Sequence, residues 1–169
     1  FIDRKGAIVI ANYFEKGFDF KHGISRVVTN GKYGLIDKTG SYILRPRYGD
    51  ISEFNRHGLA VVRYGKDKVR YGVIDTKGVK VTRSDYIKIE TYSEGLAVVK
   101  DKEGYGFIDT LGRLTIPCIY SKASGFNEGL AAVSMHGSCG YIQKNGKVGI
   151  DYLFTRCQDF DDKRAVVYK

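Results

Sequence analysis

A motif made of a hydrophobic residue, an isoleucine and an aspartate recurs along the chain at a nearly constant interval. The copies are Phe1-Ile2-Asp3, Leu35-Ile36-Asp37, Val73-Ile74-Asp75 and Phe107-Ile108-Asp109, with Tyr141-Ile142-Gln143 as a degenerate fifth copy. The third positions of successive copies are 34, 38, 34 and 34 residues apart. A fixed period of this length indicates a repeat architecture, so we expect an array of small similar units rather than one central core.

Other motifs keep the same period. A Gly-Leu-Ala-Val-Val segment begins at Gly58, recurs unchanged from Gly95 and in altered form from Gly129, and has shorter copies at Gly23-Ile24 and at 164–167. Two aromatic columns, six residues apart, comprise Phe14, Tyr48, Tyr86, Tyr120 and Phe154, and Phe20, Phe54, Tyr92, Phe126 and Phe160. Residues 1–169 therefore form a single array of about four and a half units, which we expect to be part of a longer array.

Local chemistry predicts what one unit forms. We expect a strand at the Gly-Leu-Ala-Val-Val segment and a second strand at Tyr105–Asp109, joined by a tight turn. The Asp-x-x-Gly motif that follows forms a second turn. A third strand then begins at Leu114–Ile116. Each unit is then a three-stranded antiparallel meander of ~34 residues. One meander has too little core to be stable alone, so the units must stack through their aromatic columns.

The predicted fold is all-β, an open repeat array of stacked meanders. A β-propeller is the alternative, but a four-stranded propeller blade typically needs ~40 or more residues. No apolar run reaches the roughly 18 residues of a membrane span. Cys118, Cys139 and Cys157 lack CxxC spacing and disulfide-rich density, and they are expected to be free thiols.

One unit contains, in order, the motif positions of a known repeat family. These positions are Tyr33–Gly40, Ile43–Pro46, Tyr48, Phe54 and Gly58–Val62. It resembles the WG (KWG-type) repeat family, and the resemblance extends over the whole chain. The hallmark tryptophan of the family is replaced by Tyr33, Tyr71, Tyr105 and Cys139. The resemblance implies an all-β array, found mostly in bacteria and without a shared catalytic activity. No targeting signal is visible, and the bacterial cell envelope or secretion is favoured slightly over the cytoplasm.

Catalytic motifs are missing from the sequence, which contains no HExxH, GxSxG or P-loop pattern. His22 and His57 share a column with Glu94 and Glu128, so a solvated turn is favoured over a metal site. His136 lies near Cys139, as the base of a catalytic thiol would, but both residues belong to one hairpin, and catalysis there is not favoured. The aspartates recur in almost every unit, which favours turn formation over acid catalysis. We therefore expect no catalytic residue, cofactor or metal.

The second copy departs most from the repeat. Its hairpin is three residues longer than the others, and the segment from Arg63 to Lys88 carries 8 basic and 3 acidic residues. Insertions in repeat arrays often lie on the binding face. The predicted ligand-binding residues are Arg63, Tyr64, Lys66, Lys68 and Arg70. The alternative is a solvated, variable loop.

The net charge of +9 and the pI of about 9.4 permit several anionic partners. The favoured function is a non-catalytic module that mediates protein–protein interaction, with a protein partner bound through an anionic surface. The alternative is a glycan or cell-wall binding module that uses exposed aromatic residues. Nucleic acid is a less favoured partner, and an enzyme would need an irregular polar cluster that the repeats do not show.

Overall fold

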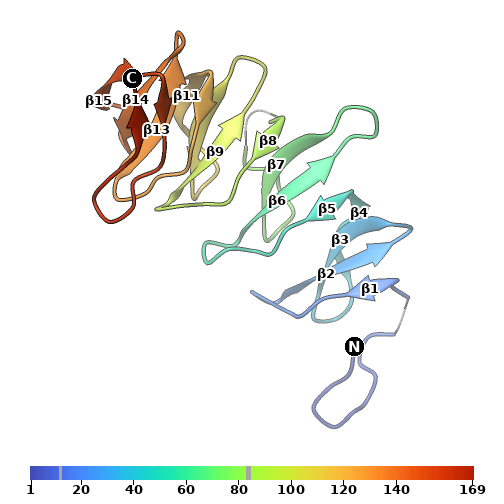
Figure 1. Cartoon of the computed structure of the whole chain (residues 1–169). Helices are drawn as coiled ribbons and strands as arrows, with labels where there is room; N and C mark the ends of the chain where they lie inside the picture. Colours follow the sequence, from blue (N-terminus) through green and yellow to red (C-terminus); the bar gives the residue numbers. More distant parts are fainter. Residues whose placement is uncertain (12, 83–84) are drawn as a thin grey trace. The chain divides into compact units, whose positions relative to one another are not determined.

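The computed structural model describes residues 1–11, 13–82 and 85–169. These residues form strands, turns and irregular segments without a helix, which confirms the all-β prediction. The chain divides into two compact units, Phe1–Val81 and Thr82–Lys169 (Figure 1). No helix in the described ranges is long and apolar enough to cross a membrane.

The first unit contains two antiparallel sheets. One sheet has the order β1-β2-β3-β4, formed by Lys16–Gly17, Ile24–Thr29, Lys32–Asp37 and Tyr42–Tyr48. The other has the order β5-β6-β7, formed by Asp50–Ile51, Leu59–Tyr64 and Arg70–Asp75.

The second unit continues the pattern. The sheet β8-β9-β10-β11 is formed by Lys88–Ile89, Leu96–Lys100, Tyr105–Asp109 and Leu114–Tyr120. The sheet β12-β13-β14-β15 is formed by Lys122–Ala123, Leu130–Met135, Ser138–Gln143 and Val148–Phe154. The last sheet pairs β16 (Arg156–Cys157) with β17 (Val167–Tyr168).

The sheets differ from the predicted meander by one short strand. Strands β1, β5, β8, β12 and β16 lie in the connection between the two aromatic columns and pair with the strand of the Gly-Leu-Ala-Val-Val motif. Complete repeats therefore form sheets of three or four strands. None of these sheets closes into a barrel in the described part of the chain, as the open-array prediction requires.

The aspartate column forms turns, as predicted. The Asp37 carboxylate accepts the backbone N–H groups of Thr39 and Ser41 at 2.8 and 3.0 Å. The Asp109 carboxylate accepts those of Leu111 and Arg113 at 2.8 and 2.9 Å. Each carboxylate thus satisfies two donors of the turn that begins the third strand.

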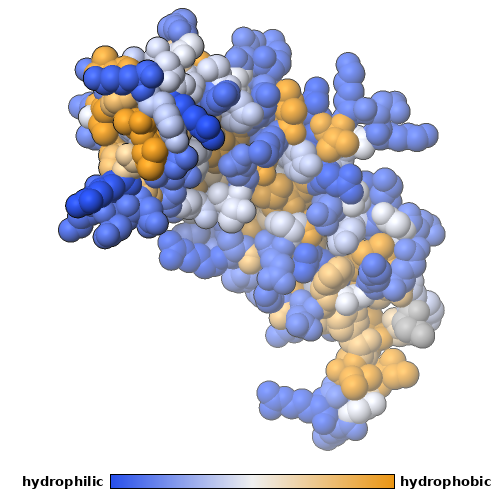
Figure 2. Space-filling model, viewed as in Figure 1, coloured by the Kyte–Doolittle hydropathy of each residue, from blue (hydrophilic) through white to orange (hydrophobic). Residues whose placement is uncertain are grey.

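The aromatic columns form the core between successive repeats. Tyr48, Tyr86, Tyr120, Phe54 and Phe126 are buried, whereas Tyr92 and the members at either end of the array are half-buried. One contact recurs with the period: the rings of Phe1 and Phe20, Phe107 and Phe126, and Tyr141 and Phe160 have centroids 5.1, 4.9 and 4.9 Å apart. Hydrophobic side chains also reach the surface near the N-terminus (Figure 2), where Ile2, Ile8 and Val9 are exposed.

Acidic side chains join neighbouring repeats in the second unit. Glu94 accepts the backbone N–H of Gly129 at 3.0 Å and pairs with Lys144 at 2.9 Å, and Glu128 accepts the N–H of Lys163 at 2.8 Å. The hydrogen bond from Lys144 is the main reason why the pKa of Glu94 lies below its ordinary value. At the equivalent positions of the first unit, His22 and His57 are exposed.

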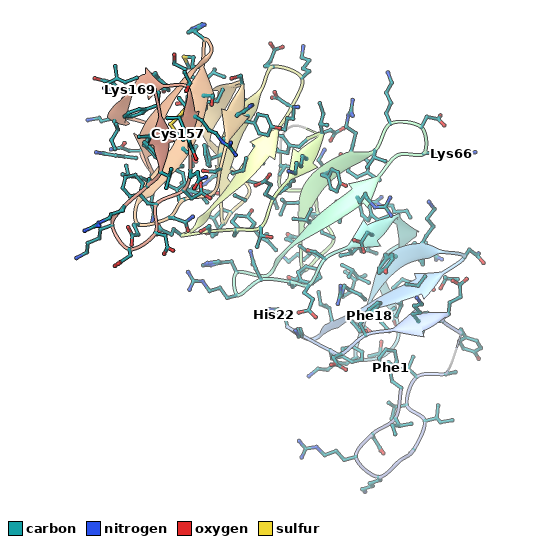
Figure 3. The ribbon with its side chains drawn as sticks, in the orientation of Figure 1. Phe1, Phe18, His22, Lys66, Cys157 and Lys169 are labelled. Carbon is teal, nitrogen blue, oxygen red and sulfur yellow. A yellow bond between two sulfur atoms is a disulfide. The ribbon has the colours of Figure 1, made fainter. Side chains whose placement is uncertain are left out.

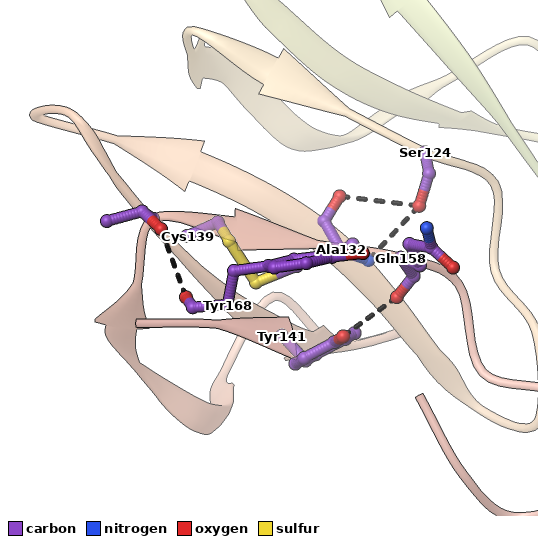
Figure 4. Close-up of a disulfide and its surroundings, with 8 residues drawn as sticks. Ser124, Ala132, Cys139, Tyr141, Gln158 and Tyr168 are labelled. Atoms are coloured by element: carbon purple, nitrogen blue, oxygen red, sulfur yellow. Dashed lines mark hydrogen bonds between the residues drawn. A yellow bond between two sulfur atoms is a disulfide. The ribbon is translucent and has the colours of Figure 1, made fainter. Parts of the chain in front are cut away.

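The expectation of three free thiols is wrong, because Cys139 and Cys157 form a disulfide (Figures 3 and 4). The cysteines are 18 residues apart in sequence, and the fold places them on β14 and on β16 of the next sheet. Cys139 occupies the column that tyrosine fills in the earlier repeats. Cys118 is the free cysteine, and burial raises the pKa of its thiol to about 12.

Replacing Phe126 by alanine should lower the free energy of unfolding by about 3–5 kcal/mol, because the side chain is fully buried between two repeats. Denaturant unfolding would measure this loss. The control is Tyr13→Ala, which removes an exposed aromatic ring and should change stability by no more than about 0.5 kcal/mol. Equal effects of the two variants would contradict the packing role of the column.

Replacing Asp109 by alanine should cost on the order of 1 kcal/mol at neutral pH, because two turn hydrogen bonds are lost. Burial raises the pKa of Asp109, but hydrogen bonds from Arg113 and Leu111 outweigh it and leave the pKa lowered. Because the pKa of this carboxyl is lower in the folded state than in the unfolded state, the ionised carboxylate stabilises the fold fully at pH values above the unfolded pKa of about 3.9. This stabilisation is lost as the pH falls through the folded pKa. The difference between wild type and variant, measured by urea unfolding, should therefore shrink toward about pH 2; a constant difference would contradict this account.

The disulfide should stabilise the second unit by about 2–4 kcal/mol, since a loop of this size loses conformational freedom when it is closed. Reducing agent should lower the melting temperature of the wild type and of Cys118→Ala, but not that of Cys157→Ser. A melting temperature of the wild type that does not respond to reduction would count against the bond.

Candidate functional site

The hairpin of the second repeat keeps the register of the other hairpins. Leu59 pairs with Asp75 just as Leu96 pairs with Asp109, so the extra residues do not disturb the body of the sheet. They lie beyond the last pair, Tyr64 and Arg70, in a connection formed by residues 65–69. The connections of β2 to β3 and of β13 to β14 are formed by residues 30–31 and 136–137 alone. The fold therefore places the additional residues at the tip, where pairing does not require them.

Gly65 gives the tip its shape. Its φ is +86°, and a Cβ at this position would lie 2.2 Å from the backbone oxygen of Lys68. Any side chain here would force the loop open. Lys66, Lys68 and the intervening Asp67 are exposed at this tip, which Figure 3 marks with Lys66.

The predicted binding residues divide between two faces of the hairpin. Residues that pair across antiparallel strands point to the same side, so Tyr64 lies with Arg70 and Arg63 lies with Tyr71. The Arg63 guanidinium donates to the backbone oxygen of Gly49 at 3.1 Å on its own face. Only part of the predicted basic set therefore lies together, and Lys66 and Lys68 extend beyond both faces.

A cluster of aromatic rings and cations surrounds Tyr64. The rings of Tyr64 and Tyr48 meet edge to face with centroids 5.8 Å apart. The Lys80 ammonium donates to the Tyr64 hydroxyl at 3.2 Å and lies 5.7 Å from its ring centroid. The Arg47 guanidinium lies 5.1 Å from the ring centroid of Tyr48. Cation–π attraction holds these cations beside the rings.

Arg47, Tyr48 and Lys80 were not among the residues predicted for this site. Tyr48 has the period of a core column, and it is indeed buried. Arg47 contacts the ring of its sequence neighbour Tyr48, whereas the approach of Tyr48 to Tyr64 depends on the packing of β4 beside β6. The high basic content of the segment around Lys80 was the one available signal.

The charges of this surface, defined as Arg47, Arg63, Lys66, Lys68 and Arg70, are not neutralised locally. None of these cations forms an ion pair with a carboxylate in the described ranges. By contrast, Lys21 and Arg26 in the first repeat pair with Glu53 at 2.7 and 3.6 Å.

A small cavity of about 80 Å³ lies between the first two repeats and is a weaker candidate. Its polar lining is already engaged, because Arg26 donates to the backbone oxygen of Ile51 at 2.8 Å and stacks 4.4 Å above the Phe18 ring. No three His, Cys, Asp or Glu side chains of the described residues approach one another closely enough to hold a metal ion. Cys139 is in a disulfide, so it is not a thiol beside His136.

The family model of the WG containing repeat matches residues 1–33, 33–66, 71–104, 105–139 and 140–169. The chain belongs to the WG repeat family. These WG repeats have tyrosine or cysteine where the family name denotes tryptophan, and Tyr33 in that position stacks on Phe18 with centroids 5.9 Å apart.

Two solved structures show a distant likeness to the chain. One is KlHsv2 with loop 6CD replaced by a Gly-Ser linker, at 15% identity and a TM-score of 0.44 over 75% of this chain and 47% of that one. The other is Kluyveromyces lactis Hsv2 with the complete loop 6CD, at 14% identity and a TM-score of 0.42 over 86% of this chain and 46% of that one. This chain thus spans about half the length of each. No curated protein matches the sequence closely.

Proposed function

We propose that this WG repeat array is a non-catalytic module that binds an acidic surface of a protein partner through the long hairpin of its second repeat. The observation that carries the proposal is the placement of three additional residues at a tip that the sheet does not need, beside cations that form no ion pair with a carboxylate of the described residues. Clusters of unneutralised cations attract anionic groups at long range.

The glycan alternative has less support. Sugar binding by stacking would need exposed aromatic rings on one face, but the aromatic columns are buried or half-buried in the interior repeats. The exposed tyrosines, Tyr13, Tyr42 and Tyr168, belong to different segments of the two units. The surface thus offers charge rather than a stacking platform.

The disulfide also bears on where the module works. Disulfides persist in oxidising compartments and are rare in the cytosol. The Cys139–Cys157 bond therefore supports a location in the cell envelope or outside the cell, where cytosolic reductants do not act on it.

Charge reversal at the tip tests the proposal. Lys66→Glu combined with Lys68→Glu should weaken binding to immobilised poly-L-glutamate by at least about tenfold, measured by surface plasmon resonance at low salt. Raising the ionic strength should weaken the wild type, because the Debye length is only about 10 Å at 0.1 M.

The matched control is Lys32→Glu combined with Lys102→Glu, which removes equal charge at the tips of two other hairpins. This control should retain most of the binding, since it leaves the long hairpin intact. If both double variants lose binding equally, the effect is one of net charge, and the proposed site is wrong.

A further inference from the structure

Two neighbouring side chains of the first repeat depart from the repeat pattern. Arg26 on β2 has the register position that belongs to Val61 in the second repeat and to Val98 in the third. Phe18 donates its backbone N–H to the carbonyl of Arg26, just as Ser52 does to that of Val61. Because the second repeat forms the same strands with serine and valine, the fold does not require phenylalanine and arginine at these positions.

The Arg26 guanidinium is largely buried, and most of its donors have no acceptor. The side chain is 16% exposed, and its guanidinium lies 4.4 Å from the ring centroid of Phe18, which Figure 3 labels. One of its five N–H groups donates to the backbone oxygen of Ile51 at 2.8 Å, and it makes no other hydrogen bond with the described residues. Its distance to the Glu53 carboxylate is 3.6 Å. A cation with so little exposure favours an acceptor for its remaining donors.

The cavity between the first two repeats adjoins this guanidinium. Its volume is about 80 Å³, and the buried side chains of Ile24 and Phe54 give it an apolar wall. Lys21 and Asp19 contribute charged groups to the same lining. At roughly 10–15 Å³ for each water, the space accommodates about five waters or a ligand with about five heavy atoms. Its chemistry suits a small molecule with an anionic end and a short apolar part.

Glu53 shows which anion these cations accept. Its carboxylate contacts the Lys21 ammonium at 2.7 Å and lies 3.6 Å from Arg26. The Glu53 side chain is 63% exposed, and exposed ion pairs contribute little to stability, so another carboxylate can replace it. Lys21, Arg26 and Asp19 then leave an excess of one positive charge in the lining, which matches a monoanion.

We propose that this cavity binds a short-chain monocarboxylate. The ligand carboxylate replaces that of Glu53 and forms two parallel hydrogen bonds with the Arg26 guanidinium, a geometry for which the two groups are matched. The alkyl part lies against Ile24 and Phe54. This site is separate from the long hairpin and does not depend on the function proposed for it.

The first experiment titrates the protein with propionate and follows the Arg26 Nε–H and the Ile24 methyl signals by NMR. We expect saturable binding with a Kd on the order of 1 mM, because so small a ligand gains little from each atom. Phe18→Ser combined with Arg26→Val gives the first repeat the pair found in the second, so this variant should fold but show no binding. Arg45→Val is the matched control: it removes an exposed arginine of β4 in the same unit and should bind like the wild type.

The second experiment tests the exchange of carboxylates. Glu53→Gln removes the competing carboxylate and should tighten propionate binding by about two- to fivefold, which corresponds to the contribution of an exposed ion pair. Phosphate should bind at least about tenfold more weakly than propionate, because it has no apolar part and carries more charge than the lining neutralises. Lys66→Glu combined with Lys68→Glu should leave propionate binding unchanged, which separates this site from the hairpin.

Four results would overturn the proposal. These are a titration that does not saturate; shifts of equal size at other arginines, which would indicate unspecific anion binding; weaker binding by Glu53→Gln; and phosphate binding as tight as that of propionate.

Discussion

Packing between repeats is the interaction on which every other feature of this protein depends. A single sheet has few apolar side chains, and these are buried only when the neighbouring repeat packs against them. The ring contact of Phe107 with Phe126 illustrates this dependence, because one ring belongs to a strand and the other to the connection leading to the next repeat. Each repeat period therefore encodes both a sheet and the connection that packs on it. Removing either ring affects two repeats.

The period made much of the fold predictable. Strands, tight turns and core columns depend on residues close in sequence, and the copies repeat the same local chemistry, as Asp37 and Asp109 do in their turns. The short strands β5 and β12 were not predicted, because two residues carry no periodic signal of their own. The Cys139–Cys157 bond was missed for a different reason: spacing rules describe local motifs, whereas this bond joins two sheets.

The candidate site was only partly predictable. The insertion and its lysines are visible in the sequence, since the spacing changes there. Which of them share a face depends on strand register, and that register separates Arg63 from Arg70. The approach of Tyr48 and Lys80 to Tyr64 follows from packing between separate segments of the first unit, which a single sequence does not reveal.

The undisturbed register of β6 and β7 shows how such an array can change in evolution. Three added residues alter the tip, while Leu59 still meets Asp75 and the core columns keep their places. The composition of the tip and the stability of the sheet are thereby encoded in separate positions of the same hairpin. New sequence can be acquired at a tip without repacking its neighbours, so each repeat can diversify independently of the rest.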